Sequence, residues 1–412
     1  MIEREVDIAI IGGGPAGLSA AIAAKKSGID DILLIERNES LGGILNQCIH
    51  EGFGIEIFGE ALTGPEYMQR FIDKVEQLKI PYMLNSMVLD INEKKCITVC
   101  SPEDLIKVKA KAIVLAMGCR ERTRGQICIP GTRPSGIYTA GCAQNLINLK
   151  NYMVGKKIVI LGSGDIGLIM ARRFKLEGAE VLAVVEILPY SSGLPRNVVQ
   201  CLEDYDIPLY LRHTVADIRG IKRVEEVVIA EVDEKRRPIK GTERRIECDT
   251  LLLSVGLIPE NELSKMAGVS LDPITNGSMV NENLETNVKG IFACGNVLHV
   301  HDLVDHVTLE AELAGESAAA FVKGELRNES NIKVTAGKGI RYVLPHLISG
   351  KNDVKFSLRV MYPDRDKKIV VRDGERILKK IPKMRINPSE MIQFNIKKEY
   401  LKDVKGLTIE LE

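Results

Sequence analysis

The sequence predicts an α/β protein made of two similar parallel-sheet domains and a small C-terminal all-β domain. Two glycine-rich turns, beginning at Gly12 and Gly162, each follow a short apolar run and precede a helical stretch. An acidic residue follows each turn at the same distance, so the chain repeats one design after 150 residues. Beyond about residue 330 the pattern changes to short β-rich runs separated by turns, which is typical of an all-β domain.

The composition is that of a globular protein with ample core. Lys and Arg together number 56, Asp and Glu also number 56, and 45% of the 412 residues are hydrophobic. This balance excludes a disordered chain, a collagen-like chain and a dedicated nucleic-acid binder. The zero net charge hides a split, because residues 331–412 carry 19 basic and 10 acidic side chains.

The first glycine-rich turn has the sequence context of a dinucleotide-binding site. The apolar run at residues 6–11 predicts a buried parallel strand, and Glu36 ends the next apolar run, 19 residues after Gly17. In this motif the first glycine permits a tight turn, the second lets the backbone approach a pyrophosphate, and the third lets helix and strand pack closely. The acid accepts hydrogen bonds from a ribose. The predicted contacts are Gly12, Gly14, Pro15, Ala16, Gly17, Glu36 and Arg37.

The second glycine-rich turn repeats this arrangement. A strand predicted at residues 157–161 leads into the turn, and a strand predicted at 181–185 ends at Glu186. An acid at this position favours NAD over NADP, because it binds a free 2′-hydroxyl and repels a 2′-phosphate. A vestigial site, or one that holds another adenine nucleotide, is the alternative. The predicted contacts are Gly162, Gly164, Asp165, Ile166, Gly167 and Glu186.

Three further segments give the chain a specific resemblance. They are the apolar strand at 112–118, a similar strand within CDTLLLSVGLIPEN at 248–261, and TNVKGIFACGN at 286–296. Together with both turns they resemble the two-dinucleotide-binding-domain flavoproteins of the pyridine nucleotide-disulfide reductase fold. The resemblance implies FAD in the first site and two Rossmann-like domains, with the NAD(P)-binding domain inserted in a split FAD-binding domain. The implied parts are residues 1–118 and 260–328 for the FAD-binding domain, 119–259 for the NAD(P)-binding domain with its linker, and 329–412 for the β-rich domain.

The same resemblance implies further FAD contacts. The family usually has Asp where this chain has Asn296, and asparagine keeps a short acceptor but loses the charge. The detail of this one contact therefore departs from the family's pattern. The additional implied contacts are Gly42, Gly43, Ala116, Gly118, Gly295 and Asn296.

A narrower likeness rests on fewer residues. GCRER at 118–122 and IPGTRPSGIYTAGCAQ at 129–144 resemble flavoprotein subunits of opine-, glycine-, sarcosine- and proline-oxidising complexes. GGILNQCIHEGFG at 42–54 and LTGPEY at 62–67 resemble the FAD/NAD oxidoreductase associated with bacterial anaerobic glycerol-3-phosphate dehydrogenase. Both likenesses imply a flavoprotein that exchanges electrons with a partner redox subunit.

The cysteines argue against the disulfide chemistry of the family's best-known members. Their number, nine, is odd, no CxxC occurs, and Cys48 is the one cysteine shortly after Gly42 and Gly43. Reduction of a disulfide needs one thiol to attack and a second to resolve, so glutathione-, lipoyl- and thioredoxin-type reduction is not expected. Cys48 is either a small buried residue or a thiol that faces the flavin, and His50 lies in the same loop.

Three of the six histidines cluster at His299, His301 and His306. A flavin-edge or proton-relay role, ordinary polar packing and a metal site are the alternatives, in that order of preference, and we expect no metal. By the resemblance, the helix that follows points its N-terminus at the flavin, where its dipole favours negative charge. The candidate catalytic residues are Cys48, His50 and His306.

These features predict an FAD-dependent oxidoreductase that moves a hydride between NAD(H) and flavin and exchanges electrons with a partner protein. The alternatives are a flavoprotein subunit that oxidises an amine, imino acid or glycerol phosphate directly, and a nucleotide-binding scaffold. The lack of a signal peptide, a long apolar run and paired cysteines predicts a cytoplasmic protein, and a homo-oligomer is compatible with the sequence. We expect deletion of residues 331–412 to spare FAD and NADH binding more than partner docking. Their basic surface is either solvated or docks an acidic partner.

Overall fold

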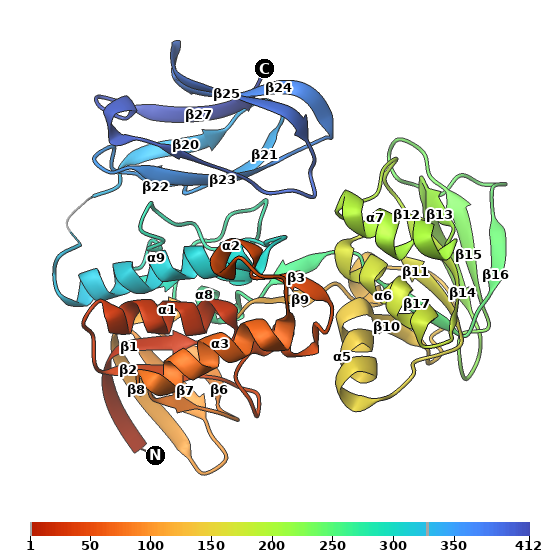
Figure 1. Cartoon of the computed structure of the whole chain (residues 1–412), viewed down its shortest axis with the longest axis horizontal. Coiled ribbons are helices and arrows are strands. Elements are labelled where there is room, and N and C mark those ends of the chain that lie inside the picture. Colours follow the sequence, from red (N-terminus) through yellow and green to blue (C-terminus); the bar gives the residue numbers. More distant parts are fainter. Residues whose placement is uncertain (1, 327–328) are drawn as a thin grey trace. The chain divides into compact units, whose positions relative to one another are not determined.

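The computed structural model describes residues 2–326 and 329–412, and the chain divides into two compact units (Figure 1). Unit 1 comprises Met1–Cys119 and Pro259–Glu412, and unit 2 comprises Arg120–Ile258. The predicted boundary between residues 328 and 329 touches residue 328, which lies outside the described residues. No helix in the described part of the chain is long and apolar enough to cross a membrane.

The large sheet of unit 1 is built on strand β1 (Ile2–Ile11), which pairs in parallel with β2 (Ile32–Ile35) and β8 (Leu105–Leu115). Strand β19 (Ile291–Ala293), from much later in the sequence, pairs in parallel with β8. The segment after the inserted unit therefore completes the sheet begun at the N-terminus. The remaining strands of this sheet are β5 (Tyr82–Met83), β6 (Met87–Ile91) and β7 (Cys96–Cys100), and the order is β5-β2-β1-β8-β7-β6.

Two helices of unit 1, α1 (Pro15–Lys26) and α9 (Val304–Val322), lie side by side in Figure 1. They pack so closely that a Cβ at position 315 would lie 2.2 Å from the carbonyl oxygen of Ala20, so only glycine fits there. A third helix of unit 1, the amphipathic α3 (Gly64–Gln77), begins with a capping box between Thr63 and Glu66. Shorter elements around these helices are η1 (Gly43–Gln47), β3 (Glu51–Phe53), α2 (Ile55–Phe58), β4 (Leu62–Thr63), α8 (Glu262–Met266) and η3 (Gly295–Val297).

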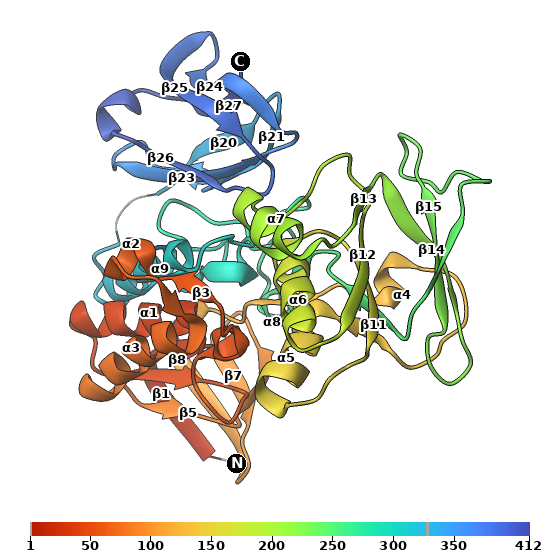
Figure 2. The same ribbon diagram turned by 45° about the vertical axis from the view of Figure 1, so that its right-hand side comes forward.

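Unit 2 is a parallel five-stranded sheet covered on both faces. Alternate residues of its central strand β11 (Lys157–Leu161) point to opposite sides, as the pleat of a strand requires. Helices cover one face of the parallel sheet and a second, antiparallel sheet covers the other (Figure 2). Ile158 and Ile160 join a core with the helices, whereas Val159 and Leu161 join a core with the antiparallel sheet.

The elements of unit 2 and of its boundary have the following bounds. The parallel sheet has the order β10 (Ile137–Thr139), β17 (Thr250–Leu253), β11, β12 (Glu180–Glu186) and β13 (Leu209–Leu211). The helices are α4 (Arg124–Ile127), α5 (Ala140–Lys150), α6 (Asp165–Leu176), α7 (Pro195–Cys201) and η2 (Glu203–Tyr205). The antiparallel sheet is β14 (His213–Arg219), β15 (Glu226–Glu231) and β16 (Arg244–Glu247), and β9 (Cys119–Glu121) pairs with β18 (Leu257–Pro259) at the boundary.

The C-terminal segment forms two sheets around one apolar core, which includes Val334, Phe356, Ile369 and Ile409. The first sheet has the order β22 (Leu347–Ile348), β20 (Ile332–Ala336), β27 (Gly406–Leu411), β24 (Asp364–Asp373) and β25 (Arg376–Ile386). The second has the order β21 (Ile340–Leu344), β23 (Val354–Val360) and β26 (Ile392–Ile396), and η4 (Lys398–Tyr400) precedes β27. The predicted fold class, two Rossmann-like domains and a C-terminal all-β domain, is confirmed.

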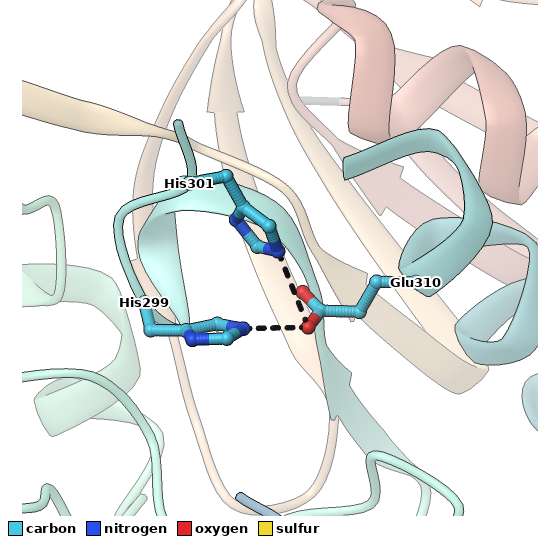
Figure 3. A group of neighbouring side chains, drawn as sticks. All are labelled: His299, His301 and Glu310. Carbon is cyan, nitrogen blue, oxygen red and sulfur yellow. Dashed lines mark hydrogen bonds and ion pairs between the residues drawn. The ribbon is translucent and has the colours of Figure 1, made fainter. Parts of the chain in front are cut away.

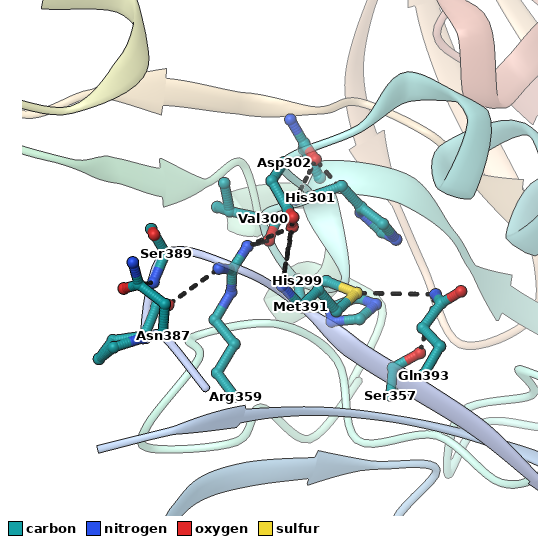
Figure 4. Close-up of polar contacts among 12 residues, drawn as sticks. His299, Val300, His301, Asp302, Ser357, Arg359, Asn387, Ser389, Met391 and Gln393 are labelled. Atoms are coloured by element: carbon teal, nitrogen blue, oxygen red, sulfur yellow. Dashed lines mark hydrogen bonds and ion pairs between the residues drawn. The ribbon is translucent and has the colours of Figure 1, made fainter. Parts of the chain in front are cut away.

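The C-terminal domain is bound to the rest of unit 1 by buried charged groups (Figure 4). Arg359 on β23 donates from Nη2 to Oδ1 of Asp302 at 2.8 Å and to the carbonyl of Val300 at 3.1 Å. The two side chains of this ion pair are 13% and 9% exposed. Asp302 also accepts the backbone N–H of Met391. The domain therefore holds the loop that carries His299 and His301.

Candidate cofactor-binding sites

The first glycine-rich turn lies between β1 and α1 and has no room for side chains at two positions. Gly12 has a φ of +109°, and a Cβ there would lie 2.3 Å from the carbonyl oxygen of Ala116 at the end of β8. A Cβ on Gly17 would lie 1.7 Å from the carbonyl oxygen of Gly12. These two glycines are therefore needed for the turn itself, as the motif predicts.

Gly14 serves a different purpose. The atom nearest to a Cβ placed on Gly14 would be the Cα of Gly43, at 3.8 Å. The protein itself therefore leaves space for a side chain at this position. Gly43 lies opposite Gly14 at the start of η1, and Gly42 precedes Gly43 with a φ of +113°. Helix α1 begins just after Gly14, with Pro15 at its start and no side-chain cap on its first turn. Bare backbone and a free helix N-terminus form a cradle that suits a pyrophosphate, so these residues fit the dinucleotide.

The acid of the first site is buried behind the turn. Glu36 is 4% exposed, and its Oε2 accepts the backbone N–H of Gly13 at 2.6 Å. Its Oε1 accepts the backbone N–H of Asn38 at 2.7 Å. Each carboxylate oxygen keeps a further lone pair for a ribose hydroxyl. Arg37, which was predicted beside it, is exposed.

The remaining predicted FAD residues lie near the same turn. Gly295, with a φ of +73°, adjoins α1, since a Cβ there would lie 2.8 Å from the Cβ of Ala16. Gly118 follows β8 with a φ of +71°. The Oδ1 of Asn296 accepts the backbone N–H of His301 at 2.9 Å, and its Nδ2 lies 3.7 Å from Sγ of Cys119. The Asn296 side chain thus supports its own loop through bonds to His301 and Cys119.

Cys48 ends the η1 turn as a buried thiol. It is 7% exposed, and burial raises its pKa to about 12. Its Sγ lies 3.5 Å from the carbonyl oxygen of Ile44, as a weak donor. None of the nine cysteines, all of which are among the described residues, is in a disulfide. A thiol of this kind is a poor nucleophile, because the thiolate is the reactive form. His50, two residues later, is partly buried with its ring 5.0 Å from that of Phe53.

The N-terminus of α9 is tied to this cysteine loop. Asp305 is 3% exposed and accepts the backbone N–H groups of Gly54 at 3.2 Å and Ile57 at 3.3 Å. Nε2 of His306 lies 3.3 Å from Oε2 of Glu56, while its buried Nδ1 has no hydrogen-bond partner among the described residues. The structure therefore brings His306 and the segment after His50 together, and Asp305 holds them there.

His299 and His301 converge instead on Glu310, a residue that the sequence analysis did not single out. Nε2 of His299 lies 2.7 Å from Oε2 of Glu310, and Nε2 of His301 lies 3.5 Å from the same oxygen (Figure 3). Burial opposes ionisation of Glu310, but the two imidazoles hold its pKa well below the ordinary value. Helical spacing could have identified Glu310 in the sequence. It lies three residues after Val307 and four before Ala314, which places it on the buried face of α9 with these two residues.

The turn of the second site, in unit 2, repeats the first. Gly162 has a φ of +95°, and a Cβ there would lie 2.0 Å from the carbonyl oxygen of Ser254. Gly167 is closed in by Ser254, whose Oγ accepts its N–H at 3.1 Å. A Cβ on Gly164 would meet nothing closer than the Oγ of Ser254 at 3.4 Å, so this position, like Gly14, is bare without being crowded. Ile166 is partly buried and packs on the helical core.

The acid of the second site is held by serines. Oε2 of Glu186 accepts three hydrogen bonds: from the backbone N–H of Ser163 at 2.9 Å, from the Ser163 hydroxyl at 2.6 Å and from the Ser192 hydroxyl at 2.9 Å. Oε1 of Glu186 accepts the backbone N–H of Leu188 at 3.0 Å and keeps a second lone pair for a ribose hydroxyl.

Asp165, predicted to contact the nucleotide, accepts through Oδ1 from Leu194 N–H at 2.7 Å and from Asn197 Nδ2 at 2.6 Å. It fixes the loop before α7.

Both sites thus share a bare-backbone turn, a helix N-terminus and a buried acid, which defines a protein that binds two dinucleotides. The sequence pattern of the pyridine nucleotide-disulphide oxidoreductase family matches residues 6–341. The chain belongs to this family and is an FAD- and NAD(P)-dependent oxidoreductase. When bound, FAD supplies the hydride and electron chemistry, and the chain supplies binding and orientation.

Individual known proteins resemble about three quarters of the chain. A Clostridium pasteurianum protein described as a 34.2 kDa protein in the rubredoxin operon is 26% identical over 302 residues, covering 72% of this chain and 90% of that protein. An NAD(P)H coenzyme A polysulfide/persulfide reductase of Pyrococcus horikoshii is 26% identical over 309 residues, and this chain spans only 64% of its length. Thioredoxin reductase of T. acidophilum has the same fold, with a TM-score of 0.64 and 23% identity over 77% of this chain and 98% of that one.

Proposed function

We propose that this protein oxidises NADH, holds the electrons on FAD and passes them to a partner redox protein without using a disulfide of its own. The observation that carries the proposal is the combination of two dinucleotide-type turns with a buried thiol, Cys48, that is in no disulfide and is the one cysteine shortly after Gly42 and Gly43. Two nucleotide sites provide for hydride transfer between NADH and FAD. A single thiol with a pKa near 12 does not provide the attack and resolution that disulfide reduction needs.

We propose the sequence-predicted glycines and acids as the contacts of the two cofactors, with α1 and α6 directing their N-termini at the pyrophosphates. NAD is preferred over NADP for a reason beyond Glu186. The two arginines of α6 that could meet a 2′-phosphate are engaged elsewhere: Nε of Arg172 donates to the Tyr205 hydroxyl at 3.3 Å, and Arg173 pairs with Glu177 at 2.7 Å. An uncompensated Glu186 would then repel the phosphate.

The nature of the acceptor separates this proposal from thiol chemistry. With excess NADH under anaerobic conditions, we expect the holoprotein to reduce a one-electron acceptor such as ferricyanide, and to leave coenzyme A disulfide and lipoamide unreduced. Cys48→Ala should keep the ferricyanide rate within about twofold, because Cys48 packs as a small hydrophobe. Disulfide reduction by the wild type that disappears in Cys48→Ala would overturn the proposal.

The reactivity of Cys48 can be measured without a substrate. A thiol with a pKa of about 12 carries almost no thiolate at neutral pH, so iodoacetamide should leave Cys48 unmodified in the folded protein. The exposed Cys100 and Cys128 serve as internal controls, because they should be alkylated in the same sample. Peptide mass spectrometry gives the extent at each position, and modification of Cys48 as fast as of Cys128 would contradict this account.

We further propose that the partner belongs to glycerol-3-phosphate metabolism, on the strength of the segments at 42–54 and 62–67. In that arrangement a second flavoprotein oxidises the substrate. Glycerol 3-phosphate alone should therefore leave the flavin of the isolated chain oxidised. Bleaching by glycerol 3-phosphate, an amine or an imino acid without NADH would favour the direct dehydrogenase instead.

A further inference from the structure

The three side chains His299, His301 and Glu310 form a cluster that the proposed electron transfer does not use. Their ligand atoms all lie within 4.8 Å of one another, and Figure 3 shows both rings pointing at the same carboxylate. His299 is 1% exposed, and the side chains of His301 and Glu310 are 1% and 11% exposed. Groups buried this completely by the protein itself do not form the surface on which a flavin lies, which argues against the expected flavin-edge role for His299 and His301.

The hydrogen bonds of His301 fix which of its nitrogens carries the proton. The Oδ1 of Asn296 accepts the backbone N–H of His301, so this atom is the amide oxygen. The Nδ1 of His301 lies 3.3 Å from the same oxygen and must therefore carry a proton. In the neutral ring, the form that binds a metal, Nδ1 is thus the protonated nitrogen. Its Nε2 then carries a lone pair.

That lone pair is the unsatisfied group of the cluster. Nε2 of His301 is buried and has no hydrogen-bond partner among residues 2–326 and 329–412. In the neutral ring it faces Oε2 of Glu310 at 3.5 Å, so that two electron-rich atoms meet in a buried place. A cation between them would turn this unfavourable contact into a favourable one.

His299 completes a ligand set around the same point. Its Nε2 lies 2.7 Å from Oε2 of Glu310, and its Nδ1 lies 3.2 Å from the Tyr342 hydroxyl. The outer nitrogen of each imidazole thus has an oxygen partner, Asn296 for one ring and Tyr342 for the other. Metal-binding histidines almost always have this arrangement, because the outer partner orients the ring and fixes its tautomer.

We propose that His299 Nε2, His301 Nε2 and Glu310 Oε2 bind a divalent transition-metal ion of the zinc type. Two imidazoles and one carboxylate are ligands that zinc prefers, with a fourth position left for water or another group. On binding, the proton shared between His299 Nε2 and Glu310 is released or moves to Nδ1, which donates it to the Tyr342 oxygen. The inference departs from the expectation that the chain holds no metal.

The site would be structural for the cofactor loop. The second oxygen of Glu310, Oε1, accepts the backbone N–H of Gly295 at 2.7 Å. A metal bound by Glu310 and by His301, which is itself held by Asn296, would therefore fix the Gly295–Asn296 turn that we propose to contact FAD. The inference does not depend on the proposed electron transfer, since it concerns binding of the ion alone.

The test is metal analysis of the FAD-loaded full-length protein. After equilibrium dialysis against buffered Zn²⁺, inductively coupled plasma mass spectrometry should find about one zinc per chain. Zn²⁺ should raise the melting temperature of chelator-treated wild type, whereas Mg²⁺ should not, because it prefers oxygen ligands. A wild type that binds no zinc and gains no thermal stability from it would overturn the inference and leave the cluster as a hydrogen-bonded triad.

Variants locate the ion. Glu310→Gln keeps an oxygen for the Gly295 N–H, and His301→Gln keeps a side chain of similar length. We expect each to weaken zinc binding at least about 10-fold, the lower bound measured for loss of outer partners alone. His213→Gln, on β14 in unit 2, is the control and should bind zinc like wild type. Equal zinc content in wild type and both site variants would place the ion elsewhere and refute the assignment.

Discussion

Replacement of Gly14 by alanine is expected to give a folded protein that does not retain FAD. The nearest atom to the new methyl group would be the Cα of Gly43 at 3.8 Å, and the backbone at Gly14 (φ −85°, ψ −170°) suits alanine. The fold is therefore spared. The methyl group nevertheless fills the cradle between the two glycine turns, so FAD should bind at least about 100-fold more weakly, a loss of about 2.7 kcal/mol.

Two further glycine variants serve as controls for this result. Gly17→Ala places a Cβ 1.7 Å from a backbone oxygen and should lose both the fold and the flavin. Gly164→Ala, the equivalent change in unit 2, should remain yellow. The measurements are the ratio of flavin to protein absorbance after purification and the melting temperature of each apoprotein. A Gly14→Ala protein with a full complement of FAD would contradict the placement of the pyrophosphate at this turn.

Replacement of Arg359 by methionine is expected to lower the free energy of unfolding of unit 1 by about 3–5 kcal/mol, because it leaves the buried carboxylate of Asp302 unpaired. Arg359 also donates to the carbonyls of Val300 and Pro388, at 3.1 and 3.0 Å. The variant should therefore loosen the loop of His299 and His301 and weaken FAD binding as well. Denaturant unfolding, followed by flavin fluorescence and circular dichroism, measures both effects.

Matched variants isolate the buried charge. Arg359→Met combined with Asp302→Asn should recover part of the lost stability, because no unpaired charge then remains. Lys109→Met breaks the Lys109–Glu5 pair, whose side chains are 65% and 77% exposed, and should change the free energy of unfolding far less than Arg359→Met does, because solvent screens an exposed pair. If Arg359→Met proves as mild as Lys109→Met, the C-terminal domain is not held through this ion pair.

Much of the fold follows from local pattern. The apolar runs at 6–11 and 157–161 are buried strands because parallel sheets covered on both faces need continuous apolar residues, and β11 divides its side chains between two cores. The acids at 36 and 186 are also local features, since each closes back on the turn of its own βαβ unit. The residues that make each of these local contacts lie within about 25 positions of each other, so a single sequence is enough to predict them.

The contacts that sequence reasoning missed join residues far apart in the chain. Arg359 meets Asp302 across 57 positions, and Tyr342 meets His299 across 43. No periodicity encodes such pairs, because they depend on how a separate β domain packs. The two bonds by which Asp165 fixes the loop before α7 also span about 30 positions, and the motif gave no sign of them.

The central claim, that NADH reduces FAD within this one chain, is tested most directly by anaerobic titration of the holoprotein with NADH. One equivalent of NADH per FAD should bleach the visible flavin absorbance of the wild type. Gly164→Ala should keep its flavin, respond to dithionite and require far more NADH. Wild-type flavin that dithionite bleaches but excess NADH leaves unchanged would contradict the account.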